Sequence, residues 1–214
     1  MKIEPIPFDL SLVRGSVPVG GDATRSGGLH VSDIWESLNE QIDPLPPELL
    51  DYYGRVGFVV ERIFEYGIAS ACMSDRYIRL GELELDGIAG SPDMVDVEKW
   101  RVIDTKCKWC SSKWAGVEGA SQREIQDAVE GKFKKEVIQL KSYCHMVTQC
   151  TDKPCNVGEL WFCFINGDYK EIAKGVRSPP HWVARRFTFT HAELVDNWNL
   201  LKNHARENGW LKTL

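Results

Sequence analysis

An acidic pair and a lysine stand close together in the stretch GSPDMVDVEKWRVIDTKCKW, which covers residues 90–109. Asp93 follows a proline, Asp104 comes eleven residues later, and Lys106 lies two residues beyond Asp104. Side chains alternate between the two faces of a β-strand, so Asp104 and Lys106 share a face if this stretch is extended. A tight antiparallel turn would place Asp93 beside them on the neighbouring strand. Because a buried charge is costly unless it is paired or binds a metal, the spacing indicates a charged site.

The chemistry open to these residue types begins with a divalent cation. Two carboxylates on neighbouring strands repel each other, and one takes up a proton unless a cation lies between them. One or two Mg²⁺ or Mn²⁺ ions fit, because both ions are hard and prefer oxygen ligands. Glu61, at the edge of the apolar stripe of a predicted helix, and the carbonyl oxygen of Thr105 would complete the shell.

A cation held in this way suits the hydrolysis of a phosphodiester, because it activates water and stabilises the charge on a phosphoryl group. Lys106 would orient or deprotonate the attacking water, or neutralise the phosphate, and deprotonation requires a lowered lysine pKa. The alternative is an ordinary Asp–Lys pair on a strand surface. The apolar strand and the preceding Pro-Asp favour a functional site.

The elements around these residues predict one α/β domain with a mixed central β-sheet flanked by helices. Helices are expected over residues 32–41, 47–67 and 124–148, and over a last segment that begins with a capping box of Thr190 and Glu193. Strands are expected over residues 77–88, 92–97, 100–108, 157–165 and 186–190. Residues 1–28, rich in glycine, proline and serine, are expected to form an extended arm before a single domain over residues 29–214.

Composition limits the class of protein. The 214 residues carry a net charge of −5, which argues against a uniformly basic surface but is compatible with a local basic groove. No apolar run reaches the length of about 18 residues that a membrane span needs, and no signal peptide is evident. We therefore expect a cytoplasmic protein whose seven cysteines are mostly reduced.

Several short motifs resemble the PD-(D/E)XK nuclease superfamily. SPD at 91–93 and VIDTK at 102–106 are similar to its signature, with aspartate in the variable acidic position. VGFVVERIF at 56–64 resembles the helix that supplies an acidic ligand in RecB-like and lambda-exonuclease-like enzymes. EVIQLKSYCHM at 136–146 resembles their Gln-x-x-x-Tyr motif, and LHVSDIW at 29–35 is similar to a segment of phage-type members. The likeness covers about residues 29–166.

This resemblance implies a restriction-endonuclease-like core and a deoxyribonuclease. Glu61, Asp93 and Asp104 would bind metal, and Lys106 would be the catalytic lysine. Gln139 and Tyr143 would steady the site or contact the DNA backbone. Some RecB-like members have a histidine where this chain has Glu61.

The resemblance also implies a biological setting. It points to an exonuclease that acts on linear duplex or single-stranded DNA ends in recombination or repair, in a microbial or phage-infected cell. A homo-oligomer and a single-strand-annealing or other recombination partner are compatible with it, and no membrane is involved.

Cations and aromatic side chains near the strand that carries Asp104 predict contacts to DNA. Tryptophan rings stack on unpaired bases and lysines bind phosphates, whereas core packing or a loop anchor is the alternative for the tryptophans. The residues assigned to DNA are Lys108, Trp109, Lys113, Trp114, Lys135 and Lys141.

The cysteines do not favour an iron–sulfur nuclease of the CRISPR-adaptation type, since the late spacings at Cys144, Cys150 and Cys155 are loose. Cys107 and Cys110 form a Cys-x-x-Cys pair without a second pair at zinc-ribbon spacing. Besides the exonuclease, the sequence leaves open a structure-specific endonuclease and a non-catalytic DNA-binding module with a nuclease fold.

Overall fold

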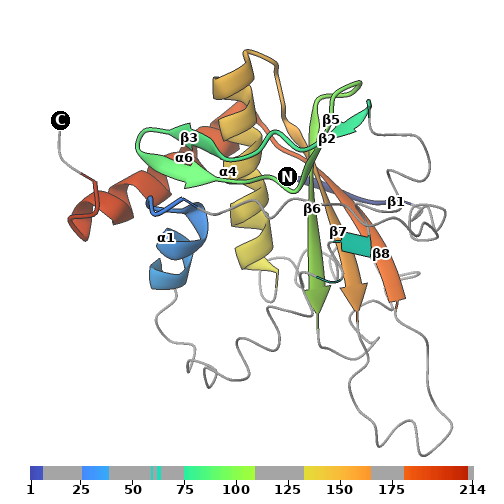
Figure 1. Ribbon diagram of the computed structural model, residues 1–214, viewed down its shortest axis with the longest axis horizontal. Helices are drawn as coiled ribbons and strands as arrows, with labels where there is room; N and C mark the ends of the chain where they lie inside the picture. The colour runs from blue at the N-terminus through green and yellow to red at the C-terminus, as the bar shows by residue number, and fades with distance from the viewer. Residues whose placement is uncertain are drawn as a thin grey trace, which may run out of the picture.

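A mixed β-sheet forms the centre of the computed structural model, which describes residues 1–6, 26–38, 59, 62–63, 75–108, 133–164 and 181–211 (Figure 1). Among these residues the sheet has six strands in the order β1-β8-β7-β6-β5-β2. The strands β6 and β7 are parallel, and the other neighbouring pairs are antiparallel. The strands are β1 (Lys2–Ile6), β2 (Tyr77–Ile78), β5 (Met94–Asp96), β6 (Arg101–Lys108), β7 (Val157–Phe164) and β8 (His181–Thr188).

The helices of the described residues form a layer on one side of this sheet. The longest, α4 (Lys134–Thr151), lies against β6 and β7, and both α1 (Val31–Leu38) and α6 (His191–Glu207) pack against α4 (Figure 1). A separate hairpin, β3 (Leu83–Leu85) and β4 (Ile88–Gly90), also contacts this helical layer. The structure thus confirms the predicted α/β architecture with a mixed central sheet and helices against it.

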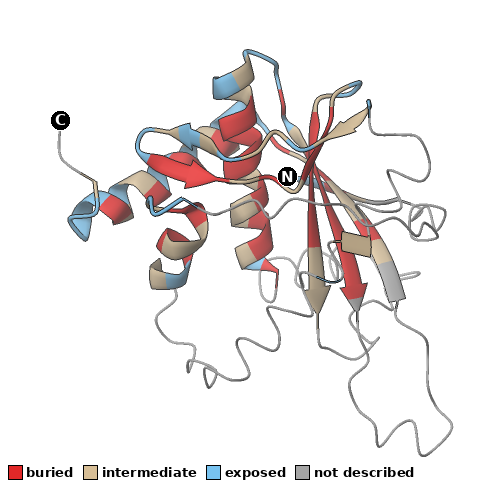
Figure 2. Ribbon diagram, in the orientation of Figure 1, coloured by how far each residue is buried: buried red, intermediate tan, exposed pale blue. Residues whose placement is uncertain are grey.

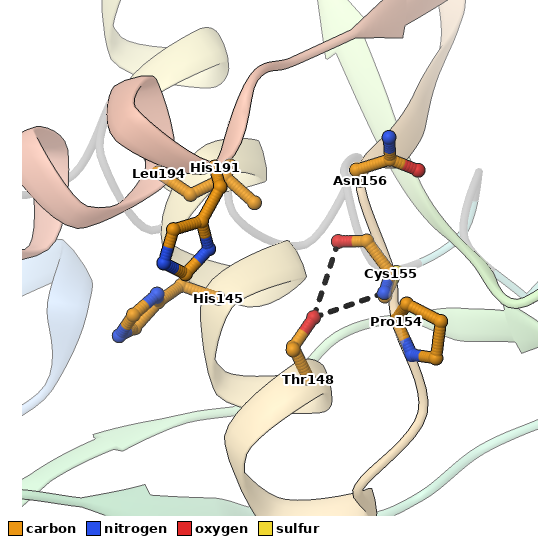
Figure 3. Close-up of a pocket in the computed structure, with 7 residues that line it drawn as sticks. All are labelled: His145, Thr148, Pro154, Cys155, Asn156, His191 and Leu194. Atoms are coloured by element: carbon orange, nitrogen blue, oxygen red, sulfur yellow. Dashed lines mark hydrogen bonds between the residues drawn. The ribbon is translucent and has the colours of Figure 1, made fainter.

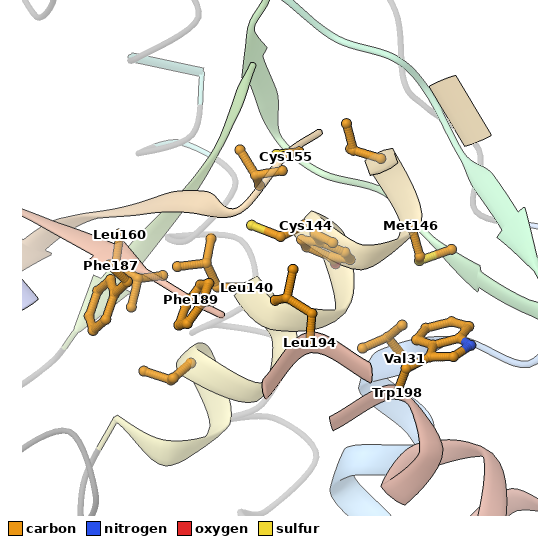
Figure 4. Close-up of a cluster of buried hydrophobic side chains, with 14 of the residues drawn as sticks. Val31, Leu140, Cys144, Met146, Cys155, Leu160, Phe187, Phe189, Leu194 and Trp198 are labelled. Carbon is orange, nitrogen blue, oxygen red and sulfur yellow. The ribbon is translucent and has the colours of Figure 1, made fainter. Parts of the chain in front are cut away.

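The core lies between the sheet and α4. Figure 2 shows buried residues concentrated on the central strands and on the helix faces that meet them. Figure 4 shows side chains from α1, α4, α6 and the sheet gathered into one apolar cluster. Its most deeply buried members include Val31, Leu140, Met146, Leu160, Phe187 and Leu201.

Local chemistry explains where several elements begin and end. Thr190 Oγ1 accepts a hydrogen bond from the Glu193 amide, and the Glu193 carboxylate accepts one from the Thr190 amide, so the predicted capping box starts α6. The last helix ends at Glu207, and Gly209 follows with a φ of 71°. At Asp86 and Gly87 two consecutive positive φ values, 53° and 77°, form the tight turn of the β3–β4 hairpin.

Some expected boundaries differ from those observed. The strand expected over 77–88 is divided into β2 and β3, which belong to different sheets. The first residues of the expected arm form β1, which pairs with β8 at the sheet edge. The helix expected over 47–67 and the start of the one expected over 124–148 lie largely outside the described residues.

Candidate active site

Asp93 is positioned by the hairpin of β5 and β6. The register pairs Met94 with Ile103 and Val95 with Val102, so Asp93 lies just outside β5, beside the Asp104–Thr105 backbone. Its Oδ2 accepts hydrogen bonds from the Thr105 amide at 2.7 Å and from Thr105 Oγ1 at 2.8 Å. Its Oδ1 makes no hydrogen bond within the described part of the chain. One carboxylate oxygen is therefore fixed to β6.

Asp104 and Lys106 form a close ion pair on the face of β6 that α4 covers. Both oxygens of Asp104 lie 2.8 Å from Lys106 Nζ. Asp104 is fully buried, and burial together with the charges of Asp93 and Glu136 raises its pKa to about 7, although Lys106 opposes the shift. Although burial favours neutral lysine, the negative charges of Asp104 and Asp93 raise the pKa of Lys106 above its ordinary value. Lys106 is consequently a cation here.

Gln139 and Tyr143 extend this site from α4. They stand four residues apart on one helix face, and Gln139 Nε2 donates a hydrogen bond to Tyr143 Oη at 2.7 Å. Burial, together with the charge of Asp104, raises the pKa of Tyr143, so its phenol stays protonated. The Gln-x-x-x-Tyr pair predicted from the sequence thus lies within electrostatic reach of Asp104 and Lys106.

The structure adds a carboxylate that the sequence analysis did not assign to the site. Glu136, in the first turn of α4, is buried and forms an ion pair with Lys108. A signal for it was present, since Glu136, Gln139 and Tyr143 follow one another at helical spacing. Nothing in the sequence indicated which strand this side of the helix would meet.

The side chains fit a hard divalent cation. Asp93 and Asp104 belong to neighbouring strands, both carry oxygen donors, and Asp93 Oδ1 is left without a hydrogen bond in the described residues. Within those residues, no three histidine, cysteine or acidic side chains are close enough to form a full metal shell. The third predicted ligand, Glu61, lies outside the described residues, and the ligand set stays a prediction.

The residues assigned to DNA are not brought together in the described structure. Lys108 binds Glu136, Lys135 binds Glu36 of α1 at 2.9 Å, and Lys141 lies 5.6 Å from the centre of the Phe189 ring. Trp109, Lys113 and Trp114 lie outside the described residues. These assignments also stay predictions.

A pocket elsewhere on the molecule is separate from this site. It has a volume of about 240 Å³ and lies between the second half of α4, the segment before β7 and the start of α6 (Figure 3). Its lining consists of His145, Thr148, Pro154, Cys155, Asn156, His191 and Leu194. None of the predicted site residues lines it.

The cysteines of the described residues are free thiols. Cys107 and Cys163 lie opposite each other on β6 and β7, and Cys144 and Cys155 are both buried in the core. Cys110, the partner of Cys107 in the Cys-x-x-Cys pair, lies outside the described residues, so the cysteine predictions are untested.

Comparison with known proteins identifies the fold. No family model and no curated protein matches the sequence. The structure is similar to that of a phage-related exonuclease from Haemophilus somnus 129PT, with a TM-score of 0.50 and 15% sequence identity, over 82% of this chain and 77% of that chain. A second solved structure, SSO0001, has a TM-score of 0.39 and 14% identity, over 84% of this chain and 77% of that one. The mixed sheet flanked by helices is thus a fold that a phage-related exonuclease also has.

None of the helices in the described part of the chain combines the length and apolar character needed to cross a membrane.

Proposed function

We propose that this chain is a divalent-cation-dependent deoxyribonuclease of the RecB-like and lambda-exonuclease-like branch of the PD-(D/E)XK superfamily. The observation that carries the proposal is the arrangement of Asp93, Asp104 and Lys106 at the β5–β6 hairpin. A buried carboxylate, a half-buried carboxylate and a half-buried lysine, gathered on neighbouring parts of a sheet, are groups suited to metal-assisted phosphodiester hydrolysis.

Each side chain has a role that follows from its charge. A bound Mg²⁺ or Mn²⁺ would supply water activation and charge neutralisation. Asp93 and Asp104 would hold the ion, with the Thr105 carbonyl and Glu61 completing its shell. Lys106 would neutralise the charge that develops on the phosphate.

Gln139 and Tyr143 would complete the phosphate-binding surface. The protonated Tyr143 hydroxyl, held by Gln139 at 2.7 Å, can donate a hydrogen bond to a non-bridging phosphate oxygen. This role differs from that of the carboxylates, because it needs no charge and no metal.

We propose exonuclease action on DNA ends as the mode of cleavage. Two things support it: the sequence resemblance to lambda-exonuclease-like enzymes, and the fold shared with a phage-related exonuclease. A structure-specific endonuclease and a binding module without catalysis are the alternatives that an experiment must separate.

The test compares end-labelled linear duplex DNA with closed circular duplex DNA, each in Mg²⁺, Mn²⁺ or EDTA. The proposal predicts metal-dependent degradation of the linear DNA alone, and the position of the label reports the polarity. Lys106→Ala should lose most of this activity. Nicking of the circle would indicate an endonuclease, and failure to cleave linear, circular or single-stranded DNA in any metal would contradict the proposal.

A further inference from the structure

Glu136 is the most unusual charged residue of α4. It lies in the first turn of the helix and is only 3% exposed. Its Oε1 binds the ammonium group of Lys108, whereas its Oε2 is buried and has no hydrogen-bond partner within the described residues. An ionised carboxylate oxygen that is buried without a partner is costly, and a bound ligand or water commonly accounts for one.

The position of Glu136 connects it to the candidate active site. Lys108 lies two residues beyond Lys106 on the same face of β6, in line with Asp104. On the opposing helix, Glu136 lies on the same side as Gln139 and Tyr143. The polar side chains on this face of β6 therefore face those of α4. The two sets are Asp104, Lys106 and Lys108 on the strand and Glu136, Gln139 and Tyr143 on the helix.

The electrostatics agree with this placement. The negative charge of Glu136 acts on the carboxylate of Asp104, after the stronger effect of Asp93. Lys108 contacts one oxygen of Glu136 and leaves the other without a hydrogen bond in the described residues.

Two roles for Glu136 differ in what they require. A counter-ion for Lys108 needs one carboxylate oxygen and no further partner. A residue that takes part in cation binding needs a second oxygen open toward the site. The buried Oε2, which has no partner in the described residues, is an acceptor that the first role leaves unused.

We propose that Glu136 is a positioning residue of the cation site, whose Oε2 accepts a hydrogen bond from the hydration shell of a divalent cation held by Asp93 and Asp104. The inference rests on the proposed function, because it assumes that this cation binds. Lys108 then acts as the orienting partner that keeps the Glu136 carboxylate in place.

The proposal requires no direct bond from Glu136 to the metal. This is consistent with the described residues, in which three acidic side chains do not come close enough to form a direct shell. Partners in the outer shell of a metal typically contribute about 10- to 100-fold to its affinity.

The test measures Mn²⁺ affinity in the absence of DNA, from the electron paramagnetic resonance signal of free Mn²⁺ during a titration. Wild type is compared with Glu136→Gln and with the control Glu36→Gln. Glu36 forms an exposed ion pair with Lys135, the residue next to Glu136 in the chain, so the control also removes a carboxylate bound to a lysine. We expect roughly 10-fold weaker binding for Glu136→Gln and wild-type binding for Glu36→Gln. Urea unfolding of each variant reports whether it is folded.

Glu136→Asp adds a measurement that does not depend on the folding of the glutamine variant. It keeps the charge but shortens the side chain, so its Mn²⁺ affinity should lie between those of wild type and Glu136→Gln. If Glu136→Gln does not fold, affinity of the aspartate variant clearly below that of wild type still supports the proposal.

The outcomes separate the two proposals. Mn²⁺ binding by wild type with unchanged affinity in Glu136→Gln or Glu136→Asp would overturn the role of Glu136 and leave the nuclease proposal intact. Absence of Mn²⁺ and Mg²⁺ binding by wild type would contradict both.

Discussion

At the residue scale, the charge on Lys106 has the clearest chemical consequence. The neighbouring carboxylates of Asp104 and Asp93 outweigh burial and raise the pKa of Lys106, so the ammonium form persists at neutral pH. A lysine that serves as a general base needs the opposite shift. The ion pair with Asp104 suits Lys106 to charge neutralisation, the role that we propose among those that the sequence left open for this lysine.

Replacing Lys106 by glutamine should lower the rate of DNA cleavage by about 100-fold, the effect of removing one group that stabilises developing charge. Mn²⁺ affinity should be unchanged or tighter, because a cation beside Asp104 is lost. Single-turnover rates at saturating DNA and a Mn²⁺ titration measure the two quantities. A normal cleavage rate would remove the proposed role of Lys106.

The sequence predicted that three of these residues would lie together, and it did not assign Glu136 to the site. Asp93, Asp104 and Lys106 are close in the chain, so a hairpin and a period of two are enough to bring them together. Glu136 meets Lys108 across 28 residues of separation. Such a contact depends on how a helix lies on a sheet, which local patterns do not determine.

At the element scale, the packing of α4 on the sheet determines where Glu136, Gln139 and Tyr143 lie. A Cβ atom at Gly158 of β7 would come within 2.6 Å of Leu140 Cγ and 2.7 Å of Leu140 Cδ2. Leu140 is fully buried and lies between Glu136 and Tyr143 on the helix. The absence of a side chain at Gly158 thus allows α4 to approach the sheet closely, which holds the polar side chains of α4 near β6.

Gly158→Ala should destabilise the protein by about 1–3 kcal/mol, the usual cost of overpacking a core, and should lower cleavage by displacing α4. Gly27→Ala is the matched control, because a Cβ at that position meets nothing within 4 Å. Urea unfolding and the cleavage rate measure the two effects. Equal stability of the two variants would show that Leu140 leaves enough room for a methyl group at residue 158.

The start of α6 gives a prediction with a defined pH dependence. Although burial opposes the shift, hydrogen bonds from Thr190 help to lower the pKa of Glu193 from 4.5 to about 2. A carboxyl group whose pKa is lowered by folding stabilises the folded state fully when the pH lies above the pKa of the unfolded chain. For Glu193 that contribution is lost as the pH falls from about 4.5 to about 2.

Thr190→Ala should therefore cost about 1 kcal/mol at neutral pH, and the difference from wild type should shrink in acid over that interval. Urea unfolding at neutral pH and near pH 3 measures both differences. A penalty that stays the same at both pH values would show that the ionised Glu193 does not contribute to the cap.

Helices and strands differed in how far the sequence determined them. The capping box marks the start of α6, and Gly209 follows its end. Both are local features, so the limits of this helix could be predicted from the sequence. The division between β2 and β3 could not, because it arises when residues 77–78 pair with β5 while residues 83–85 pair with β4. The strand β1 depends likewise on a partner, β8, far along the chain.

At the scale of the whole molecule, a buried ion network connects strands on the sheet face opposite α4. Arg101 donates to Asp96 at 2.6 Å and to Glu159 at 2.7 Å, and Arg186 donates to Glu159 at 2.8 Å. These residues belong to β5, β6, β7 and β8. The network thus ties the hairpin that carries Asp93 and Asp104 to the rest of the sheet.

Arg101→Met should destabilise the protein by about 3 kcal/mol, because it leaves two buried carboxylates with less compensation. The control is Lys2→Met in the exposed Lys2–Glu4 pair, which should change stability by less than about 0.5 kcal/mol. Urea unfolding compares the two, and a small effect of Arg101→Met would show that Arg76 and Arg186 suffice to neutralise the network.

The central claim is that Asp104 belongs to the metal site of a nuclease. Its most direct test is the cleavage of end-labelled linear duplex DNA in Mg²⁺ by wild type and by Asp104→Asn, which replaces one carboxylate oxygen with an amide group at nearly constant shape. We predict cleavage by wild type that EDTA abolishes, and none by a variant whose thermal unfolding shows it to be folded. Undiminished cleavage by folded Asp104→Asn would contradict the claim.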